Sequence, residues 1–337
     1  MTTHTQRASD AAVTADAAVT ADAADVPVDA YLRRIGAARP DRPDVAALRD
    51  LHLRHLKTVP FENLSIHLGE DIVLEEKPLL DKIVGAGRGG FCYEINSTFA
   101  VLLRELGFAV TLLQARCFGK GGRLGIPYDH MAVLVETAEE GRWLADVGFG
   151  DHSHFPLALD ERGDQPDPGG TFRVVETEDG DLDVLRDGEP QYRLDRRPRV
   201  LADFTAGAWY HRTSPDSHFT RSLVCSRLTE EGRITLSGHK LVTTVFGGER
   251  QERLLDGEDE VRAAYRDLFG IELGELPAAP PSRERGAAAA AAPTASGSTP
   301  DGSTPDGSTP DGSTPDGSTP DGSTPDGSAP AGSDPSA

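Results

Sequence analysis

The chain has 337 residues, with 55 Asp or Glu against 34 Lys or Arg, so its formal net charge is -21 at pH 7. Contacts with nucleic-acid phosphates need clustered basic side chains, so this excess of carboxylates argues against nucleic-acid binding. No stretch approaches the roughly 18 apolar residues of a membrane span, and the first residues lack an export signal. We therefore expect neither a nucleic-acid nor a membrane partner.

The cysteines are few and widely spaced, at Cys92, Cys117 and Cys225. This spacing fits neither a disulfide framework nor the closely paired cysteines of a metal site. We expect a reducing, cytoplasmic compartment and no bound metal ion.

Both ends of the chain have a biased composition. Residues 1–26 contain AAVTAD twice in succession and almost no large apolar side chain, and residues 298–327 are six copies of STPDG. Such segments cannot bury enough apolar surface to offset the entropy of ordering, and STPDG lacks the apolar positions that a stacked repeat needs. We predict disordered extensions over 1–26 and 277–337.

The spacing of apolar side chains predicts helices over 27–107. They are Tyr31, Leu32 and Ile35 in a first segment, and Val45, Leu48, Leu51, Leu53 and Leu56 in a second. A further helix is predicted directly after Gly89 and Gly90, with Cys92 in its first turn. We expect a helical bundle that carries a nucleophile.

Short β-branched and apolar runs follow over 108–200. They are VTLLQARCF, HMAVLVE, RWLADVGF, TFRVVETE and DLDVL. Turn residues separate them, which is typical of an antiparallel sheet or barrel. Residues 201–276 combine the strand-like runs RITLSG and KLVTTVFG with a final helix near 258–269, so we expect a mixed α/β unit there. The fold class is therefore predicted to be α+β.

Cys92 is the candidate nucleophile. Gly89 and Gly90 allow main-chain N–H groups to approach a bound group without obstruction by a Cβ atom. The positive end of the predicted helix favours the thiolate, which is the reactive form of cysteine. Cys117 and Cys225 lack this setting and are interpreted as small apolar core residues.

His130 is the candidate base, because it begins a strand after the Gly-rich loop 119–125. The runs HMAVLVE and RWLADVGF flank the polar stretch TAEEG, which predicts a hairpin with Asp146 in the second strand, near His130. Asp146 stands among apolar residues, and an unpaired buried carboxylate is costly, so a partner is expected. A surface-facing Asp146 in an edge strand would need no partner.

Other residues carry weaker signals. His152 and His154 form an HxH pattern, which without a third ligand is interpreted as part of a loop rather than a metal site. Phe61, Phe149 and Phe219 fit either the hydrophobic core or a substrate pocket.

Five segments in chain order resemble the arylamine N-acetyltransferase family. They are VPFENLSIHLG (59–69), RGGFCYEIN (88–96), DHMAVLVE (129–136), WLADVGFG (143–150) and SHFTRSLVCSRLTEEGRITLSG (217–238). The resemblance covers about 27–275 and leaves the two ends outside. It implies a helical bundle, a β-barrel and an α/β lid around a core that resembles papain-like proteases.

The resemblance also implies a catalytic triad of Cys92, His130 and Asp146. Within the same matched segments, we hypothesise that Glu62 and Arg88 form a buried ion pair that supports the active-site turn.

A ligand cleft is implied as well. Acetyl-coenzyme A would be the donor in ping-pong kinetics, with no tightly bound cofactor, and arylamines, arylhydrazines or arylhydroxylamines would be the acceptors, as in xenobiotic metabolism. Phe61, Phe149 and Phe219 would line the cleft, while Gly148 and Gly150 would permit close approach of the coenzyme. A homo-oligomer stays open.

Three other functions remain in competition at this point. A macrolactam-forming amide synthase of polyketide biosynthesis is a relative with the same triad. A cysteine peptidase or transglutaminase uses similar geometry on peptide amides. A binding protein that has lost turnover is disfavoured by the intact triad.

Overall fold

The computed structural model describes residues 28–137 and 141–278. The extension predicted over 1–26, and the one predicted at the other end apart from residues 277 and 278, lie outside these ranges. All described residues belong to one unit. The domain boundaries expected near residues 107 and 200 stay a prediction.

The helices of the described residues are short, and many of them precede the large sheet in the chain. They are α1 (Val28–Ile35), α2 (Val45–Thr58), α3 (Leu64–Leu68), α4 (Glu76–Leu80), the π-helical turn η1 (Asp81–Gly85), α5 (Cys92–Glu105), the 3-10 turns η2 (Lys120–Gly122) and η3 (Leu201–Phe204), α6 (Thr205–Thr213), α7 (His218–Arg221) and α8 (Gly257–Phe269). The helices predicted near 31, 45, 92 and 258 are all present.

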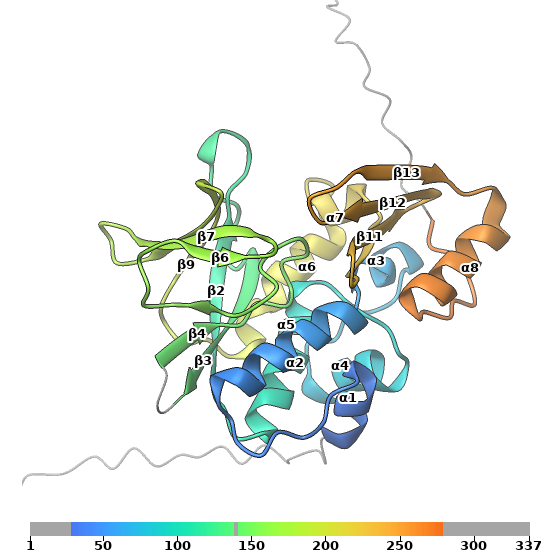
Figure 1. Ribbon diagram of the computed structural model, residues 1–337. Helices are drawn as coiled ribbons and strands as arrows, with labels where there is room; N and C mark the ends of the chain where they lie inside the picture. Colours follow the sequence, from blue (N-terminus) through green and yellow to red (C-terminus); the bar gives the residue numbers. More distant parts are fainter. Residues whose placement is uncertain (1–27, 138–140, 279–337) are drawn as a thin grey trace, which may run out of the picture. The chain divides into compact units, whose positions relative to one another are not determined.

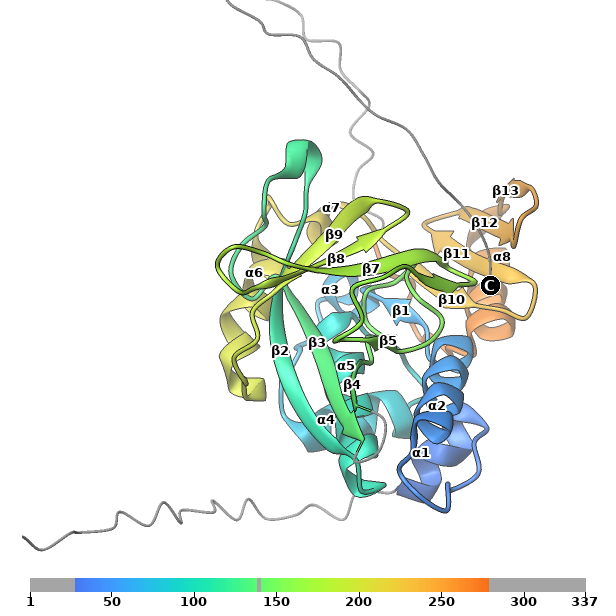
Figure 2. The same cartoon turned by 60° about the vertical axis from the view of Figure 1, so that its left-hand side comes forward.

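Helix α5 occupies the centre of the main hydrophobic core. Its residues from Cys92 to Leu103 are all buried, so it has no solvent-facing side over this length. It packs against strands β2 (Ala109–Cys117) and β3 (His130–Thr137) on one side and against α1 and α4 on the other (Figure 2). A helix buried all round holds its first residue in a fixed place.

The larger sheet is antiparallel and nearly closed into a barrel. Its order is β5-β4-β3-β2-β9-β8-β7-β6, and every neighbouring pair runs antiparallel (Figure 1). Besides β2 and β3, its strands are β4 (Gly141–Leu144), β5 (Leu157–Ala158), β6 (Gln165–Asp167), β7 (Gly170–Glu176), β8 (Leu182–Arg186) and β9 (Glu189–Leu194). The structure thus confirms the α+β class.

A second, five-stranded sheet joins distant parts of the chain. Its order is β1-β10-β11-β12-β13, with β1 (Phe61–Glu62), β10 (Cys225–Leu228), β11 (Gly232–Ser237), β12 (Lys240–Val245) and β13 (Arg250–Leu254). Phe61 pairs with Ser226, and Glu62 pairs with Cys225. Phe61 also forms a bridge with Gly90, so β1 links the turn before Cys92 to this sheet.

Two local predictions differ from the structure. Asp146 was expected in the second strand of a hairpin, but β4 ends at Leu144. The hairpin itself exists, with Leu134 opposite Leu144, and the chain then turns because the Asp146 carboxylate accepts the Gly148 N–H group at 3.0 Å. Such an Asx turn competes with strand pairing.

Helices α6 and α7 were also not expected from the sequence. Their apolar residues are few, and Gly207, Ala208 and His211 are the buried residues of α6. Packing on the rest of the protein stabilises this helix more than its own sequence does. Among residues 28–137 and 141–278, no helix combines the length and apolar character of a membrane span.

Candidate active site

Cys92 begins helix α5, as the glycine pair predicts. Phe91 is the N-cap residue, and its N–H group donates to the Glu94 carboxylate at 3.2 Å. A Cβ atom on Gly89 would lie 1.9 Å from the Pro60 carbonyl oxygen, and one on Gly90 would lie 2.7 Å from the Glu94 side chain. Only glycine fits at both positions, so the turn before the cysteine depends on them.

His130 and Asp146 lie together beside Cys92. The distance between His130 Nε2 and Asp146 Oδ2 is 2.7 Å, and both side chains are buried. Burial alone lowers the pKa of His130, but Asp146 and the Cys92 side chain outweigh it and raise the pKa to about 10. Because Nε2 faces the carboxylate, Nδ1 is left for the sulfur. The imidazole stands between an acidic side chain and a thiol, and the proximity of Asp146 and His130 is the part that the hairpin argument expects.

The carboxylate of Asp146 is held by one further side chain and one main-chain N–H group. Its Oδ1 accepts from Asn96 Nδ2 at 2.9 Å and from the Gly148 N–H group. Asn96 also donates to the Met131 carbonyl at 2.6 Å and accepts from the Val147 N–H group. Burial alone raises the pKa of Asp146, but the imidazolium of His130 beside it lowers the pKa below its usual range.

Asn96 is thus a functional candidate missed at the sequence level. It lies one helical turn after Cys92, on the same side of α5, which is the signal that would have found it. Gly148 leaves room for it, because a Cβ atom there would lie 2.6 Å from Asn96 Nδ2 and 2.9 Å from the Cys92 Cα atom.

A cavity of about 560 Å³ brings together four of the five residues expected around the cleft. They are Phe61, Phe149, Gly150 and Phe219, whereas Gly148 lies against Asn96 and Cys92. The Phe149 ring meets the His130 ring edge-on, with centroids 5.2 Å apart. The rings of Phe61 and Phe219 are 6.0 Å apart. Phe149 therefore contacts both this cavity and the His130 ring.

Polar residues of the later sheet and of the 151 turn also line this cavity. Arg233 and Arg250 supply positive charge, and Asp151 lies 3.3 Å from Arg233 Nε. Sequence reasoning missed these residues, because nothing in the order of the chain places β11 and β13 beside Phe149.

The hypothesised pair of Glu62 and Arg88 is present beneath the nucleophile turn. Arg88 Nε lies 3.0 Å from Glu62 Oε1, and the Glu62 side chain is fully buried. Arg88 also reaches Glu70 at 3.3 Å. Burial alone raises the pKa of Glu62, but the charges of Lys82 and Arg88 hold it below its usual range.

The HxH histidines are buried in a loop behind the site. His152 packs against the Phe149 and Tyr192 rings, with centroids 4.9 and 5.5 Å away. Burial lowers the pKa of His152 to about 4, which leaves it neutral at physiological pH. Within the part of the chain that the structure describes, no group of three or more His, Cys, Asp or Glu side chains is placed to hold a metal ion.

Comparison with known proteins agrees with this geometry. A family model described as N-acetyltransferase matches residues 44–277. The arylamine N-acetyltransferase of Escherichia coli (strain K12) is 34% identical over 252 residues, which cover 73% of this chain and 89% of that protein.

Solved structures give the same result. The M. smegmatis arylamine N-acetyl transferase is 33% identical with a TM-score of 0.68, covering 73% of this chain and 93% of that one. The Mycobacterium marinum arylamine N-acetyltransferase in complex with CoA is 30% identical with a TM-score of 0.66, covering 72% and 92%. The family model covers both sheets and the candidate triad, and together these matches confirm the resemblance seen in the sequence. The chain belongs to the arylamine N-acetyltransferase family.

Proposed function

We propose that this protein transfers an acetyl group from acetyl-coenzyme A to an aromatic amine through an acetyl thioester on Cys92. The reaction class follows from the family to which the chain belongs. The observation that carries the residue roles is the position of His130, bonded to Asp146 at 2.7 Å and interacting with Cys92 on its other side. The same family membership favours acetyl transfer over the macrolactam-forming reaction.

The first half-reaction starts from the Cys92 thiolate and the His130 imidazolium and uses up both charges. With a pKa of about 10, His130 is an imidazolium at neutral pH and stabilises the Cys92 thiolate. The thiolate attacks the thioester carbonyl, and N–H groups in the first turn of α5, which have no acceptor within the helix, stabilise the oxyanion. The carbon–sulfur bond to coenzyme A then breaks. The departing thiolate takes the proton of His130, which leaves a neutral imidazole and acetyl-Cys92.

The second half-reaction restores the starting state. An aromatic amine attacks the acetyl carbonyl of acetyl-Cys92, and neutral His130 accepts the proton that the amine loses. The carbon–sulfur bond to Cys92 breaks, and the thiolate and imidazolium are present again. Nε2 of the imidazole donates its hydrogen bond to Asp146, so Nδ1 is the nitrogen that gives up the proton in the first half-reaction and accepts it in the second.

The cavity lined by Phe61, Phe149 and Phe219 is proposed to hold the aromatic acceptor next to the acetyl group. Aromatic faces stack well on aromatic ligands, and Phe149 already touches the imidazole. Gly150, at the same cavity, would admit the donor close to the main chain. Arylamines, arylhydrazines and arylhydroxylamines all present a nucleophilic nitrogen or oxygen on a flat ring, and they form the proposed acceptor class.

Intact-mass measurement tests the donor directly. Protein mixed with acetyl-coenzyme A in the absence of amine should gain one acetyl group, and peptide mapping should locate it on Cys92. Adding an aromatic hydrazine should then remove it and yield the acetylated hydrazine. A protein that gains no acetyl group, yet accepts a polyketide chain from its carrier, would instead be an amide synthase.

A further inference from the structure

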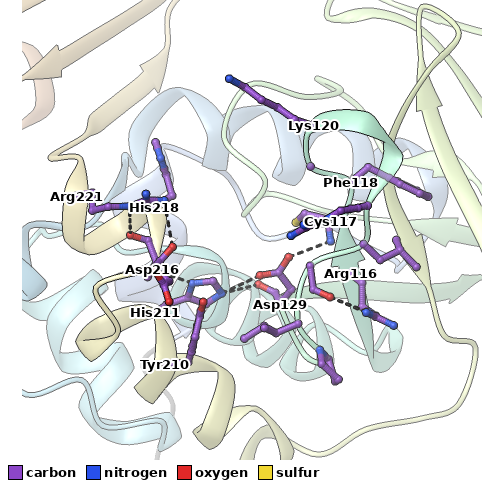
Figure 3. A pocket seen from close by; sticks show the side chains of 17 residues that line it. Arg116, Cys117, Phe118, Lys120, Asp129, Tyr210, His211, Asp216, His218 and Arg221 are labelled. Atoms are coloured by element: carbon purple, nitrogen blue, oxygen red, sulfur yellow. Dashed lines mark hydrogen bonds and ion pairs between the residues drawn. The ribbon is translucent and has the colours of Figure 1, made fainter. Parts of the chain in front are cut away.

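A second set of contacts lies next to the proposed triad. His211, on α6, directs Nε2 toward Asp129, the residue immediately before His130 (Figure 3). Nε2 lies 3.1 Å from Asp129 Oδ1 and 3.2 Å from the Asp129 main-chain oxygen. Both side chains are largely buried, at 8% and 14% exposure. A buried carboxylate needs a partner of this kind.

The same main-chain oxygen also contacts the neighbour of Cys92. The Tyr93 hydroxyl donates to the Tyr128 carbonyl at 2.6 Å and to the Asp129 carbonyl at 3.1 Å. One carbonyl is thus shared by His211 and by the residue that follows the nucleophile. These contacts link the start of β3, which carries His130, to the start of α5, which carries Cys92.

Helix α6 packs closely against Tyr93 and Tyr128. Gly207 precedes His211 by one helical turn, and a Cβ atom there would lie 2.5 Å from the Tyr128 carbonyl oxygen and 2.8 Å from the Tyr93 hydroxyl. Any larger residue would push the helix away. The glycine and the histidine are therefore two independent signs that α6 is placed against the segment preceding His130.

The other side of His211 leads to the cavity. Its Nδ1 lies 3.2 Å from Ser217 Oγ, and that oxygen accepts the Phe219 N–H group at 3.2 Å. Phe219 lines the cavity proposed for the acceptor. The Asp129 carboxylate has a second partner, because its Oδ2 accepts the Cys117 N–H group at 3.1 Å.

We propose that His211 is a positioning residue, which through Asp129 holds His130 in register with Cys92 and through Ser217 holds Phe219 at the cavity. It touches none of the reacting atoms. This inference rests on the proposed function, since it assigns His211 a role in the same reaction. A buried hydrogen bond between two side chains restricts their relative positions, and a misplacement of about 1 Å can slow a reaction about a hundredfold.

The test compares His211→Phe with His211→Gln. Phenylalanine keeps the ring but removes both hydrogen bonds, whereas the glutamine amide can still donate to Asp129. Two rates are measured: alkylation of Cys92 by iodoacetamide, followed on the Cys92 peptide by mass spectrometry, and single-turnover formation of acetyl-Cys92 at saturating acetyl-coenzyme A. His239→Phe is the matched control, because His239 is an exposed histidine whose ring bonds only the Leu255 carbonyl among the described residues.

We expect His211→Phe to slow both rates about tenfold or more, with the KM for acetyl-coenzyme A changed less than about threefold. His211→Gln should recover most of the loss, and His239→Phe should match the wild type. A purely structural histidine would instead lower the melting temperature and the folded fraction while the folded molecules kept their rates. Unchanged rates in His211→Phe, or a loss that His211→Gln does not reduce, would overturn the proposal.

If His211→Phe does not fold, Asp129→Asn takes its place, because it keeps the shape and removes the charge that faces His211. It should then slow both rates about threefold to tenfold, and unchanged rates would count against the proposal. The alkylation arm needs no coenzyme. If the wild-type protein is not acetylated by acetyl-coenzyme A, the proposed function is refuted. The alkylation rates of the His211 variants still show whether His211 positions the residues around Cys92.

Discussion

Two neighbourhoods of this protein each contain a cysteine, a histidine and an aspartate, but in different orders of contact. In the first, His130 lies between Cys92 and Asp146. In the second, Asp129 lies between Cys117 and His211. The order decides the chemistry, because an imidazolium beside a thiol favours the thiolate and a carboxylate beside a thiol opposes it.

Cys117 shows the effect of the second order. Burial raises the pKa of its thiol well above the usual value, and the Asp129 charge raises it further. The thiol also stands at the end of a strand and is not itself part of a helix N-terminus. The same three residue types therefore give a proposed nucleophile at the start of helix α5 and an inert thiol at the end of strand β2.

The largest expected effect separates the two cysteines. Cys92→Ser should reduce acetyl transfer on the order of a thousandfold, because an alkoxide is far harder to form than a thiolate. Cys117→Ser, the matched control, should stay within about threefold of the wild type. Steady-state acetylation of an aromatic hydrazine measures both. Activity of Cys92→Ser above a tenth of the wild type would contradict the role of Cys92.

The next comparison is between the two aspartates. Asp146→Asn should slow acetyl-Cys92 formation on the order of a hundredfold, because the amide no longer stabilises the imidazolium or selects its tautomer. Asp129→Asn should produce a clearly smaller loss, since Asp129 contacts no triad side chain. Single-turnover kinetics measure both variants. Equal losses would mean that the two carboxylates share one role.

A third comparison concerns the support under the nucleophile turn and a surface ion pair. Arg88→Ala should lower the free energy of unfolding by about 3–5 kcal/mol, because it leaves the Glu62 carboxylate buried and unpaired, and turnover should fall with it. Arg173→Ala is the control, since Arg173 pairs with Asp164 at the surface at 2.6 Å and should lose less than about 1 kcal/mol.

Urea unfolding followed by circular dichroism measures both arginine variants. A fully stable but inactive Arg88→Ala protein would point to a direct part of Arg88 in catalysis instead.

The last comparison concerns the pH dependence that the first neighbourhood imposes on stability. The pKa of His130 is raised to about 10, above the value of about 6.5 in an unfolded chain. A raised pKa stabilises the folded state fully below about pH 6.5, and this contribution is lost as the pH rises toward about 10. The melting temperature of the wild type should therefore fall over this window.

Asp146→Asn should flatten that fall, because Asp146 is the main group that raises the pKa of His130. Differential scanning calorimetry at a series of pH values compares the two proteins. Parallel curves for the wild type and Asp146→Asn would show that the pair does not contribute to stability in this range.

Local patterns were enough to predict much of the fold and most of the candidate site. The glycines before Cys92 and the apolar spacing after it mark the start of α5, and alternating runs mark the β3 and β4 hairpin. The hairpin brings the end of β4 close to β3, so Asp146, two residues beyond it, comes near His130. These signals are local in the chain, so one sequence can carry them.

The remainder depends on contacts between distant segments. Asn96 supports Asp146 only because the turn after β4 folds back onto α5, and Phe61 meets Phe219 only because β1 pairs with β10. Helix α6 has weak helical signals of its own, and its position comes from the fit of Gly207 against Tyr128 and Tyr93. Spacing along the chain contains no information about such approaches.

By itself, then, the sequence determined which residues could react and which elements present them, because turns, helix starts and strand periodicity act over a few residues. Only the tertiary structure decided that His130 stands between Cys92 and Asp146 while Asp129 stands between Cys117 and His211. That order arises from long-range packing of α5, α6 and the barrel strands, which places charges within hydrogen-bonding distance regardless of their separation along the chain.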